Sequence, residues 1–246
     1  MNFKNFALLV MLSVSFAACK KSEEEVTRPV EFPETTYQTL GTFDNSGKPN
    51  YLLPKDGISA DLASFVSTTL PQGGDLRTTH PELLSSTALA DITITQSSDI
   101  FITYISNGSG TTNSIGFYTY PTNKPLTSAK DIKTITYIFP NAGSGSTLEA
   151  GDKVKIGRFD AGTSVGFVLL NRAWNSSSGS LDNKVVHFCS NDILNPEVDP
   201  KLKKHVVLIN YTPENKVLMG FEDLDRTSSI CDHDFNDMVV YATVTP

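Results

Sequence analysis

Two short stretches decide the fold class, "SIGFYTYP" at residues 114–121 and "SVGFVLL" at residues 164–170. Both are rich in β-branched and aromatic residues, a composition typical of strands. About ten such runs follow one another from residue 91 onward, separated by Gly, Asn, Pro and Ser, with no helical pattern between them. This organisation predicts an all-β, mainly antiparallel fold of the β-sandwich or jelly-roll type rather than a parallel α/β sheet.

One segment ahead of these runs has helical periodicity. Apolar residues from Ile58 to Val66 recur at helical spacing, Ser59 can cap the first turn, and Pro71 stops the pattern. We therefore expect one short helix over residues 59–70. A single helix in a mostly extended chain is expected to cover a sheet or an open end of the sandwich.

The N-terminus has the pattern of an export signal. Residues 1–18 contain an early lysine and an apolar stretch, and they end in two alanines directly before Cys19. This is typical of a signal peptide, and the apolar stretch is too short to span a bilayer as a helix. Small residues ahead of a cysteine resemble a bacterial lipobox, so we expect Cys19 to carry a lipid anchor. Simple secretion with a free thiol is the alternative.

The segment after Cys19 is polar. Residues 19–40 are rich in charged residues and prolines, so we expect a lipidated flexible tether there and a single domain over residues 41–246. The run "SEEE" at residues 22–25 resembles the signal that directs bacterial lipoproteins to the outer face of the outer membrane. We expect the protein to be anchored in outer-membrane lipid and to face the cell exterior.

The net charge restricts the partners. The sequence has 20 basic and 27 acidic residues, a formal net charge of -7. Because one of the basic residues lies in the signal peptide, the mature chain is slightly more acidic still. Such a surface, without a basic stripe, repels nucleic acid and anionic membranes, so nucleic acid is excluded as a partner.

Two cysteines remain once Cys19 is lipidated. Cys189 and Cys231 are an even pair in a compartment that permits disulfides, and we predict a disulfide between them. A second interpretation stays open, since His187 precedes one cysteine by two residues and His233 follows the other by two. Strand alternation places each His and Cys pair on one face, where the four side chains could form a tetrahedral zinc site.

No pattern in the sequence predicts catalysis. It contains neither a nucleophile elbow nor a helix with two metal-binding histidines. The glycine-rich stretch at residues 141–151 lacks the lysine and the following helix of a phosphate-binding loop, so we expect a loop between two strands. His205 opens an apolar run and is expected at a strand end or core edge. We expect a protein that is not an enzyme.

Three aromatic residues define an alternative function. Trp174, the only tryptophan, lies at a transition from strand to loop, where its ring could stack on a sugar, although packing in the core is the simpler expectation. Tyr118 and Tyr120 would have to line the same groove. In this alternative the chain is a carbohydrate-binding module of a glycan uptake or degradation system.

Acidic residues concentrate near the C-terminus, with Arg226 as the only basic residue among them. The acids are Glu222, Asp223, Asp225, Asp232, Asp234 and Asp237. Two carboxylates 4 Å apart repel by about 4 kcal/mol at an effective dielectric constant near 20, so the cluster is costly unless water or a cation compensates it. Calcium prefers oxygen ligands, and the stretch from Asp232 to Asp237 supplies them at close intervals. A solvated loop without an ion is the alternative.

The same stretch is not an EF-hand. Residues 232–236 match the first half of an EF-hand loop, but Asp237 replaces the turn glycine and Thr243 replaces the bidentate glutamate. The flanking segments also have the pattern of strands. We therefore expect Glu222 and Asp223, from the preceding strand end, to complete a calcium site of another kind.

The C-terminal motif resembles a known family. "GFEDL" at residues 220–224 and "DHDFNDMVVYATV" at residues 232–244 resemble the signature of the domain-of-unknown-function family 4114, found in bacterial surface proteins including LruC-type lipoproteins. Upstream segments from about residue 51 also look similar, "NSIGFYTYP" among them. The resemblance implies a calcium-associated β-sandwich of surface or adhesin-like proteins, without a defined ligand or reaction. We expect an extracellular protein or glycan as the partner. The resemblance also implies Phe221 and Phe235 as core anchors. The implied calcium ligands are Glu222, Asp223, Asp232, Asp234, Asn236 and Asp237.

Overall fold

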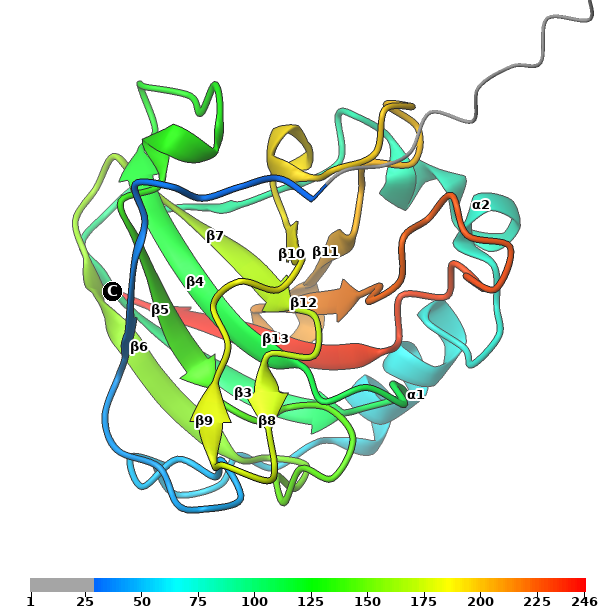
Figure 1. Ribbon diagram of the computed structural model, residues 1–246. Coiled ribbons are helices and arrows are strands. Elements are labelled where there is room, and N and C mark those ends of the chain that lie inside the picture. Colours follow the sequence, from blue (N-terminus) through cyan, green and yellow to red (C-terminus); the bar gives the residue numbers. More distant parts are fainter. Residues whose placement is uncertain (1–28) are drawn as a thin grey trace, which may run out of the picture.

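The computed structural model describes residues 29–246, which form two β-sheets packed face to face (Figure 1). The predicted signal peptide and Cys19 lie outside the described residues. In the first sheet the strand order is β1 (Thr36–Thr39), β5 (Thr134–Phe139), β4 (Ser114–Pro121), β7 (Thr163–Leu170) and β10 (His187–Cys189), and β2 (Ile92–Thr93) also pairs with β7. In the second sheet the order is β11 (Val206–Tyr211), β12 (Lys216–Phe221), β13 (Met238–Thr245), β3 (Ser98–Ser106) and β6 (Lys153–Phe159).

The described strands pair antiparallel except for β1, which runs parallel to β5. The predicted all-β, mainly antiparallel sandwich is therefore confirmed. A separate two-stranded ribbon joins β8 (Trp174–Asn175) and β9 (Ser180–Leu181). The α-helices are α1 (Ala60–Thr69) and α2 (Leu76–Thr79), and short 3-10 turns occupy Pro81–Leu84, Ala129–Asp131, Asp192–Leu194 and Thr212–Glu214.

The main core lies between the two sheets. Alternate residues of facing strands meet there, such as Ile102 and Val240 from the second sheet and Phe117 and Phe167 from the first. Alternation along a strand gives each sheet a second apolar face. Because these outer faces are also apolar, each needs a cover of its own.

Helix α1 covers the outer face of the second sheet. Its buried residues Leu62 and Val66 lie in one cluster with Val207, Leu218 and Tyr241 of that sheet. The Ser59 hydroxyl accepts a hydrogen bond from the Leu62 N–H at 3.0 Å and so caps the helix. The predicted covering helix over residues 59–70 is confirmed.

The N-terminal segment covers the outer face of the first sheet. Val30 and Phe32 pack on the cluster that contains Ile135 and Val168, and β1 continues the sheet beyond β5. The predicted boundary between tether and domain at residues 40 and 41 is therefore wrong, since residues 30–39 are part of the domain. The sequence did not indicate that these residues belong to the domain, because a short, polar edge strand has the same composition as a tether.

Two further features of the fold have no role in the site. Residues 141–151 connect β5 to β6 without a helix, as expected for a loop between strands. Among residues 29–246, no helix combines the length and apolar character needed to cross a membrane.

Candidate cation site beside strands β12 and β13

The acidic loop joins two neighbouring strands of the second sheet. Phe221, the last residue of β12, pairs with Met238, the first residue of β13, so Glu222 and Asp237 directly adjoin the paired strands. The Asp223 N–H donates to Asp237 Oδ2 at 2.8 Å. In Figure 1 the loop runs from orange to red beside α2. The strand pairing therefore brings acids that are distant in the sequence to one end of the sheet.

Five of the carboxylates form two groups that share Glu222. In one group its carboxylate oxygen lies within 4.8 Å of oxygens of Asp232 and Asp234. In the other, oxygens of Glu222, Asp223 and Asp237 lie within the same distance of one another. Calcium–oxygen distances are roughly 2.4 Å, so oxygens around one ion lie at about these separations. The predicted ligands Glu222, Asp223, Asp232, Asp234 and Asp237 are thus brought together.

Glu222 is the centre of the cluster. Its side chain is 0% exposed, and its Oε2 atom has no hydrogen-bond partner. Burial raises the pKa of this carboxyl group, since removal from water disfavours the charged form. A buried carboxylate oxygen without a partner is costly, and a cation ligated by it removes that cost. These residues therefore fit a calcium ion.

Asp223 is fixed by a loop that the sequence did not single out. Its Oδ2 atom accepts hydrogen bonds from Thr111 Oγ1 at 2.7 Å, from Asn113 Nδ2 at 2.6 Å and from the Ser109 hydroxyl. These donors lie in the connection from β3 to β4. Small polar residues next to glycines are typical of any turn, so nothing in the sequence marked them as part of the site.

Asp234 is held from the opposite side by the connection between α1 and α2. The Gly73 N–H donates to Asp234 Oδ2 at 2.7 Å, and the Asn236 N–H donates to Asp234 Oδ1 at 3.0 Å. His233 and Phe235 flank Asp234 with φ of 58° and 56°, the left-handed region that non-glycine residues rarely adopt. Such strained backbone persists where surrounding contacts fix it, and it concentrates at binding sites.

Asp237 is a half-buried acid that lies beside two other carboxylates. Burial raises its pKa to about 9, and the neighbouring Asp223 and Glu222 carboxylates add to the effect. Burial likewise raises the pKa of Asp234. Without a cation, the cluster therefore relieves its repulsion by keeping protons, and a divalent ion would replace them.

The remaining predicted residues lie at the margin of the cluster. Asp225 Oδ1 accepts hydrogen bonds from the Thr227 N–H at 2.8 Å and hydroxyl at 2.7 Å, so this acid caps a local turn. The Asn236 amide oxygen is buried without a hydrogen-bond partner. A Cβ added to Gly108 would lie 2.5 Å from that oxygen, so Asn236 faces the β3–β4 loop closely.

Arg226 is a buried part of the same region. It is 2% exposed, and its Nη1 donates to the Lys204 carbonyl at 2.9 Å. Its guanidinium carbon lies 5.1 Å from the centroid of the Phe235 ring, and Nε donates to His233 Nδ1 at 3.2 Å. The sequence indicated only that Arg226 offsets part of the acidic charge. In the structure Arg226 also contacts the strained turn through His233 and Phe235. The implied core anchors Phe221 and Phe235 are both fully buried.

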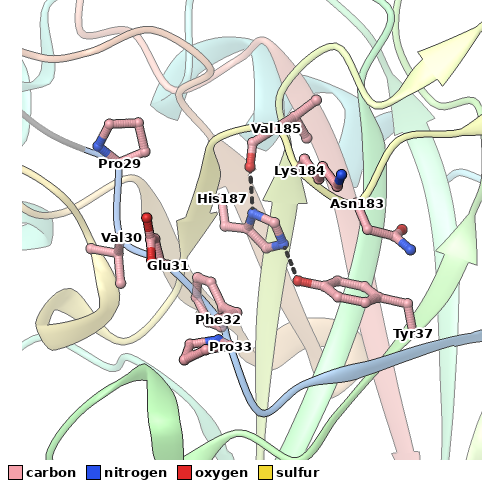
Figure 2. Close-up of a pocket in the computed structure, with 10 residues that line it drawn as sticks. All are labelled: Pro29, Val30, Glu31, Phe32, Pro33, Tyr37, Asn183, Lys184, Val185 and His187. Atoms are coloured by element: carbon pink, nitrogen blue, oxygen red, sulfur yellow. Dashed lines mark hydrogen bonds between the residues drawn. The ribbon is translucent and has the colours of Figure 1, made fainter.

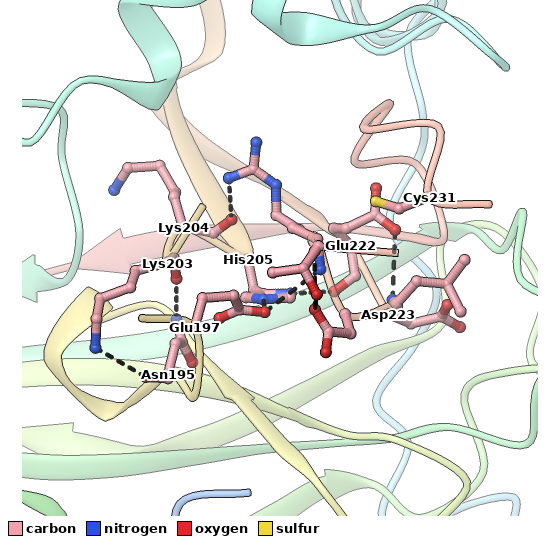
Figure 3. Close-up of polar contacts among 12 residues, drawn as sticks. Asn195, Glu197, Lys203, Lys204, His205, Glu222, Asp223 and Cys231 are labelled. Atoms are coloured by element: carbon pink, nitrogen blue, oxygen red, sulfur yellow. Dashed lines mark hydrogen bonds and ion pairs between the residues drawn. The ribbon is translucent and has the colours of Figure 1, made fainter. Parts of the chain in front are cut away.

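His205 connects Glu222 to a second buried acid (Figure 3). Its Nδ1 lies 3.0 Å from the Glu222 carbonyl oxygen, and its Nε2 lies 2.6 Å from Glu197 Oε1. Its ring stacks on Phe188 at 3.9 Å between centroids. His205 directly precedes β11 and is fully buried, so the expected place at a strand end is correct, and its role is to position the main chain of Glu222.

The predicted disulfide is wrong. Cys189 and Cys231 are both free and buried. On β10, Phe188 points into the main core, so Cys189 points to the opposite, outer face of the first sheet. Cys231 lies in the acidic loop, with its Sγ 3.3 Å from His233 Nδ1. Burial and the neighbouring Glu222 raise the pKa of this thiol.

The alternative zinc site is also not assembled. His187 uses both ring nitrogens elsewhere, with Nε2 2.9 Å from Tyr37 Oη and Nδ1 2.7 Å from the Val185 carbonyl oxygen. Figure 2 shows these contacts in a cleft of about 850 Å³ between the N-terminal segment and residues 183–187, where the His187 ring stacks on Phe32. His233 belongs to the acidic loop instead.

The three aromatic residues do not line a groove. Trp174 is 2% exposed and packs against Phe43 at 5.8 Å between ring centroids. Tyr118 is buried against Gly166, where a Cβ would lie 2.3 Å from its ring. The Tyr120 hydroxyl donates to Asp91 at 2.5 Å. Packing in the core, the simpler expectation for Trp174, is therefore confirmed, and the alternative of a shared sugar-stacking surface is not formed because Trp174 and Tyr118 are buried within the domain.

Comparison with known proteins supports the predicted resemblance. The model of the family described as Domain of unknown function (DUF4114) matches residues 159–245. No curated protein and no solved structure matches the chain. The matched segment contains both halves of the acidic motif but begins well after residue 51, where the predicted resemblance started. The protein is thus an all-β sandwich whose C-terminal part is similar to DUF4114.

Proposed function

We propose that the protein is a surface-exposed bacterial lipoprotein whose β-sandwich is stabilised by calcium and acts in binding, adhesion or surface architecture rather than in catalysis. The observation that carries the calcium proposal is Glu222, fully buried with an unpartnered carboxylate oxygen between two pairs of aspartates. The lipoprotein part rests on the signal pattern of residues 1–18 and on Cys19.

The ion would act as a structural clamp. It would draw together the end of β12 at Glu222 and Asp223 and the start of β13 at Asp237, where unshielded carboxylates otherwise repel one another. Asp223 and Asp234 would extend the clamp to the two loops that donate to them. Calcium is favoured over zinc because all the converging side chains offer oxygen ligands.

Thermal unfolding of the purified protein tests the calcium proposal. An ion that binds only the folded state stabilises it by about 2.7 kcal/mol at one hundred times its dissociation constant, so Tm should rise with calcium concentration and fall with chelator. Glu222→Gln should remove the rise. Asp225→Asn, in the same loop but with its side chain in a local turn, is the matched control and should keep it. An unchanged Tm for the unaltered protein would refute the clamp.

The location is tested on cells of the source bacterium. The proposal expects outer-membrane lipid to hold the protein through Cys19 and an extracellular protein or glycan to be its partner. Antibody against the domain should label intact cells, and added protease should remove the label. Cys19→Ala should abolish lipid labelling and release the chain from the membrane fraction. Labelling only after the outer membrane is permeabilised would contradict the outward orientation.

A further inference from the structure

The five carboxylates form two groups of three, and each group is compact enough to surround one ion. Ligands of a single calcium ion lie within about 5 Å of one another, twice the calcium–oxygen distance. Asp232 and Asp234 meet this condition with Glu222, and Asp223 and Asp237 meet it with Glu222, so each group of three can ligate an ion of its own. Glu222 is the only member common to both groups.

The charge of the cluster also exceeds what one ion compensates. When ionised, the five carboxylates have five negative charges. One divalent cation leaves three of them uncompensated in a largely buried place, whereas two cations leave one. The buried guanidinium of Arg226, which interacts electrostatically with Glu222, offsets that last charge.

We propose that the cluster binds two calcium ions bridged by the Glu222 carboxylate, an inner ion at Asp223 and Asp237 and an outer ion at Asp232 and Asp234. This inference rests on the proposed function and adds a second site to it. A carboxylate has two oxygens and can ligate two ions at once, and Glu222 Oε2 has no other partner.

The two ions would differ in exchange with solvent. The inner position is enclosed, because Asp223 is buried and takes hydrogen bonds from Thr111 and Asn113. The outer position includes Asp232, the exposed member of the cluster. The outer ion should therefore dissociate first as calcium falls. Its loss would free the α1–α2 connection, which is joined to Asp234 through Gly73, and would leave β12 and β13 clamped.

Native mass spectrometry of the calcium-depleted protein during a calcium titration counts the ions. The expected result is two ions per chain, bound in two steps. The double variant D232N/D234N and the single variant D237N should each keep one ion, Glu222→Gln should keep none, and Asp225→Asn should keep two. The ion remaining in D232N/D234N should bind more tightly than the ion remaining in D237N, by tenfold or more.

The outcomes separate this inference from the clamp itself. One ion at saturation in the unaltered protein, or complete loss of binding in a folded D232N/D234N variant, would overturn the bridged pair and leave a single-ion clamp. No bound ion would overturn both. Near-ultraviolet circular dichroism confirms folding of each variant, and the count on the unaltered protein decides the question even where a variant fails to fold.

Discussion

The main-chain N–H of Asp223 donates to the side chain of Asp237 at 2.8 Å, joining the residues that leave β12 and enter β13. This hydrogen bond fixes the separation between the two ends of the acidic loop. It also holds two carboxyl groups side by side, so the arrangement is stable only when protons or cations reduce their repulsion.

The stability of the calcium-free protein should fall as pH rises. Asp237 ionises near pH 4 in an unfolded chain, whereas its pKa in the folded protein is about 9. Between these values the folded state binds more protons than the unfolded state, so the free energy of unfolding decreases with pH. The raised pKa values of Glu222 and Asp234 act in the same direction.

Thermal melts from pH 5 to pH 8 measure this effect. We expect Tm of the calcium-free protein to decrease across the range, and saturating calcium to flatten the dependence because the ion replaces the protons. Asp237→Asn should also flatten it without calcium. A calcium-free Tm that increases from pH 5 to pH 8 would show that Asp237 is ionised in the folded state.

Gly108→Ala should damage the site from outside the acidic loop. An added Cβ would lie 2.5 Å from Asn236 Oδ1 and 2.9 Å from the Asn236 carbonyl oxygen, so the β3–β4 loop must move away. We expect a loss of about 1 to 3 kcal/mol in stability and weaker calcium binding. Urea unfolding and calcium titration measure the two effects.

Gly110→Ala is the matched control for that change. It lies in the same loop, and an added Cβ there has no atom within 4 Å. Stability and calcium affinity should both stay near those of the unaltered protein. Equal losses in the two variants would mean that the loop tolerates no side chain anywhere, and that contact with Asn236 is not the cause.

Arg226→Ala should strongly destabilise the fold. The change removes the hydrogen bond to the Lys204 carbonyl and the contact with the Phe235 ring, and it leaves Glu222 and Glu197 without the nearby buried cation. Loss of one partner from a buried charged network costs about 3 to 5 kcal/mol. Arg77→Ala, at a half-exposed arginine paired with Asp75, should cost less than about 1 kcal/mol in the same urea experiment. Similar costs for both would contradict the supporting role of Arg226.

Both cysteines of the domain should be free thiols. Alkylation of the denatured protein without reductant, followed by peptide mass spectrometry, should label both Cys189 and Cys231. In the folded protein both should react slowly, since both are buried and burial raises their pKa. A peptide pair joined through the two cysteines would restore the disulfide and require a rearranged loop.

The sequence predicted the features that depend on local pattern. Strand runs, the helix capped by Ser59 and the acids beside the last strand all follow from periodicity and composition. It also predicted that Glu222 and Asp223 join the later aspartates, because adjacent antiparallel strands bring their ends together. Five of the six implied ligands meet for this reason.

The errors concern the direction in which side chains point in the folded protein, because residue spacing in the sequence does not determine it. Cys189 and Cys231 looked paired, but one residue of register on β10 decides which face of the sheet the thiol occupies. Spacing also left open a groove lined by Trp174 and Tyr118, whereas both side chains are buried in the fold. Ser109, Thr111 and Asn113 were overlooked because an ordinary turn sequence acquires its role only where the fold places it beside Asp223.

Hydrogen exchange with and without calcium tests the central claim most directly, because it locates the effect of the ion along the chain. The clamp predicts that calcium slows exchange in residues 222–237 and in the two loops that donate to Asp223 and Asp234, residues 107–113 and 72–76. Exchange in β6, which lies at the far edge of the second sheet, should change little under native conditions. Equal exchange in the acidic loop with and without calcium would contradict the account.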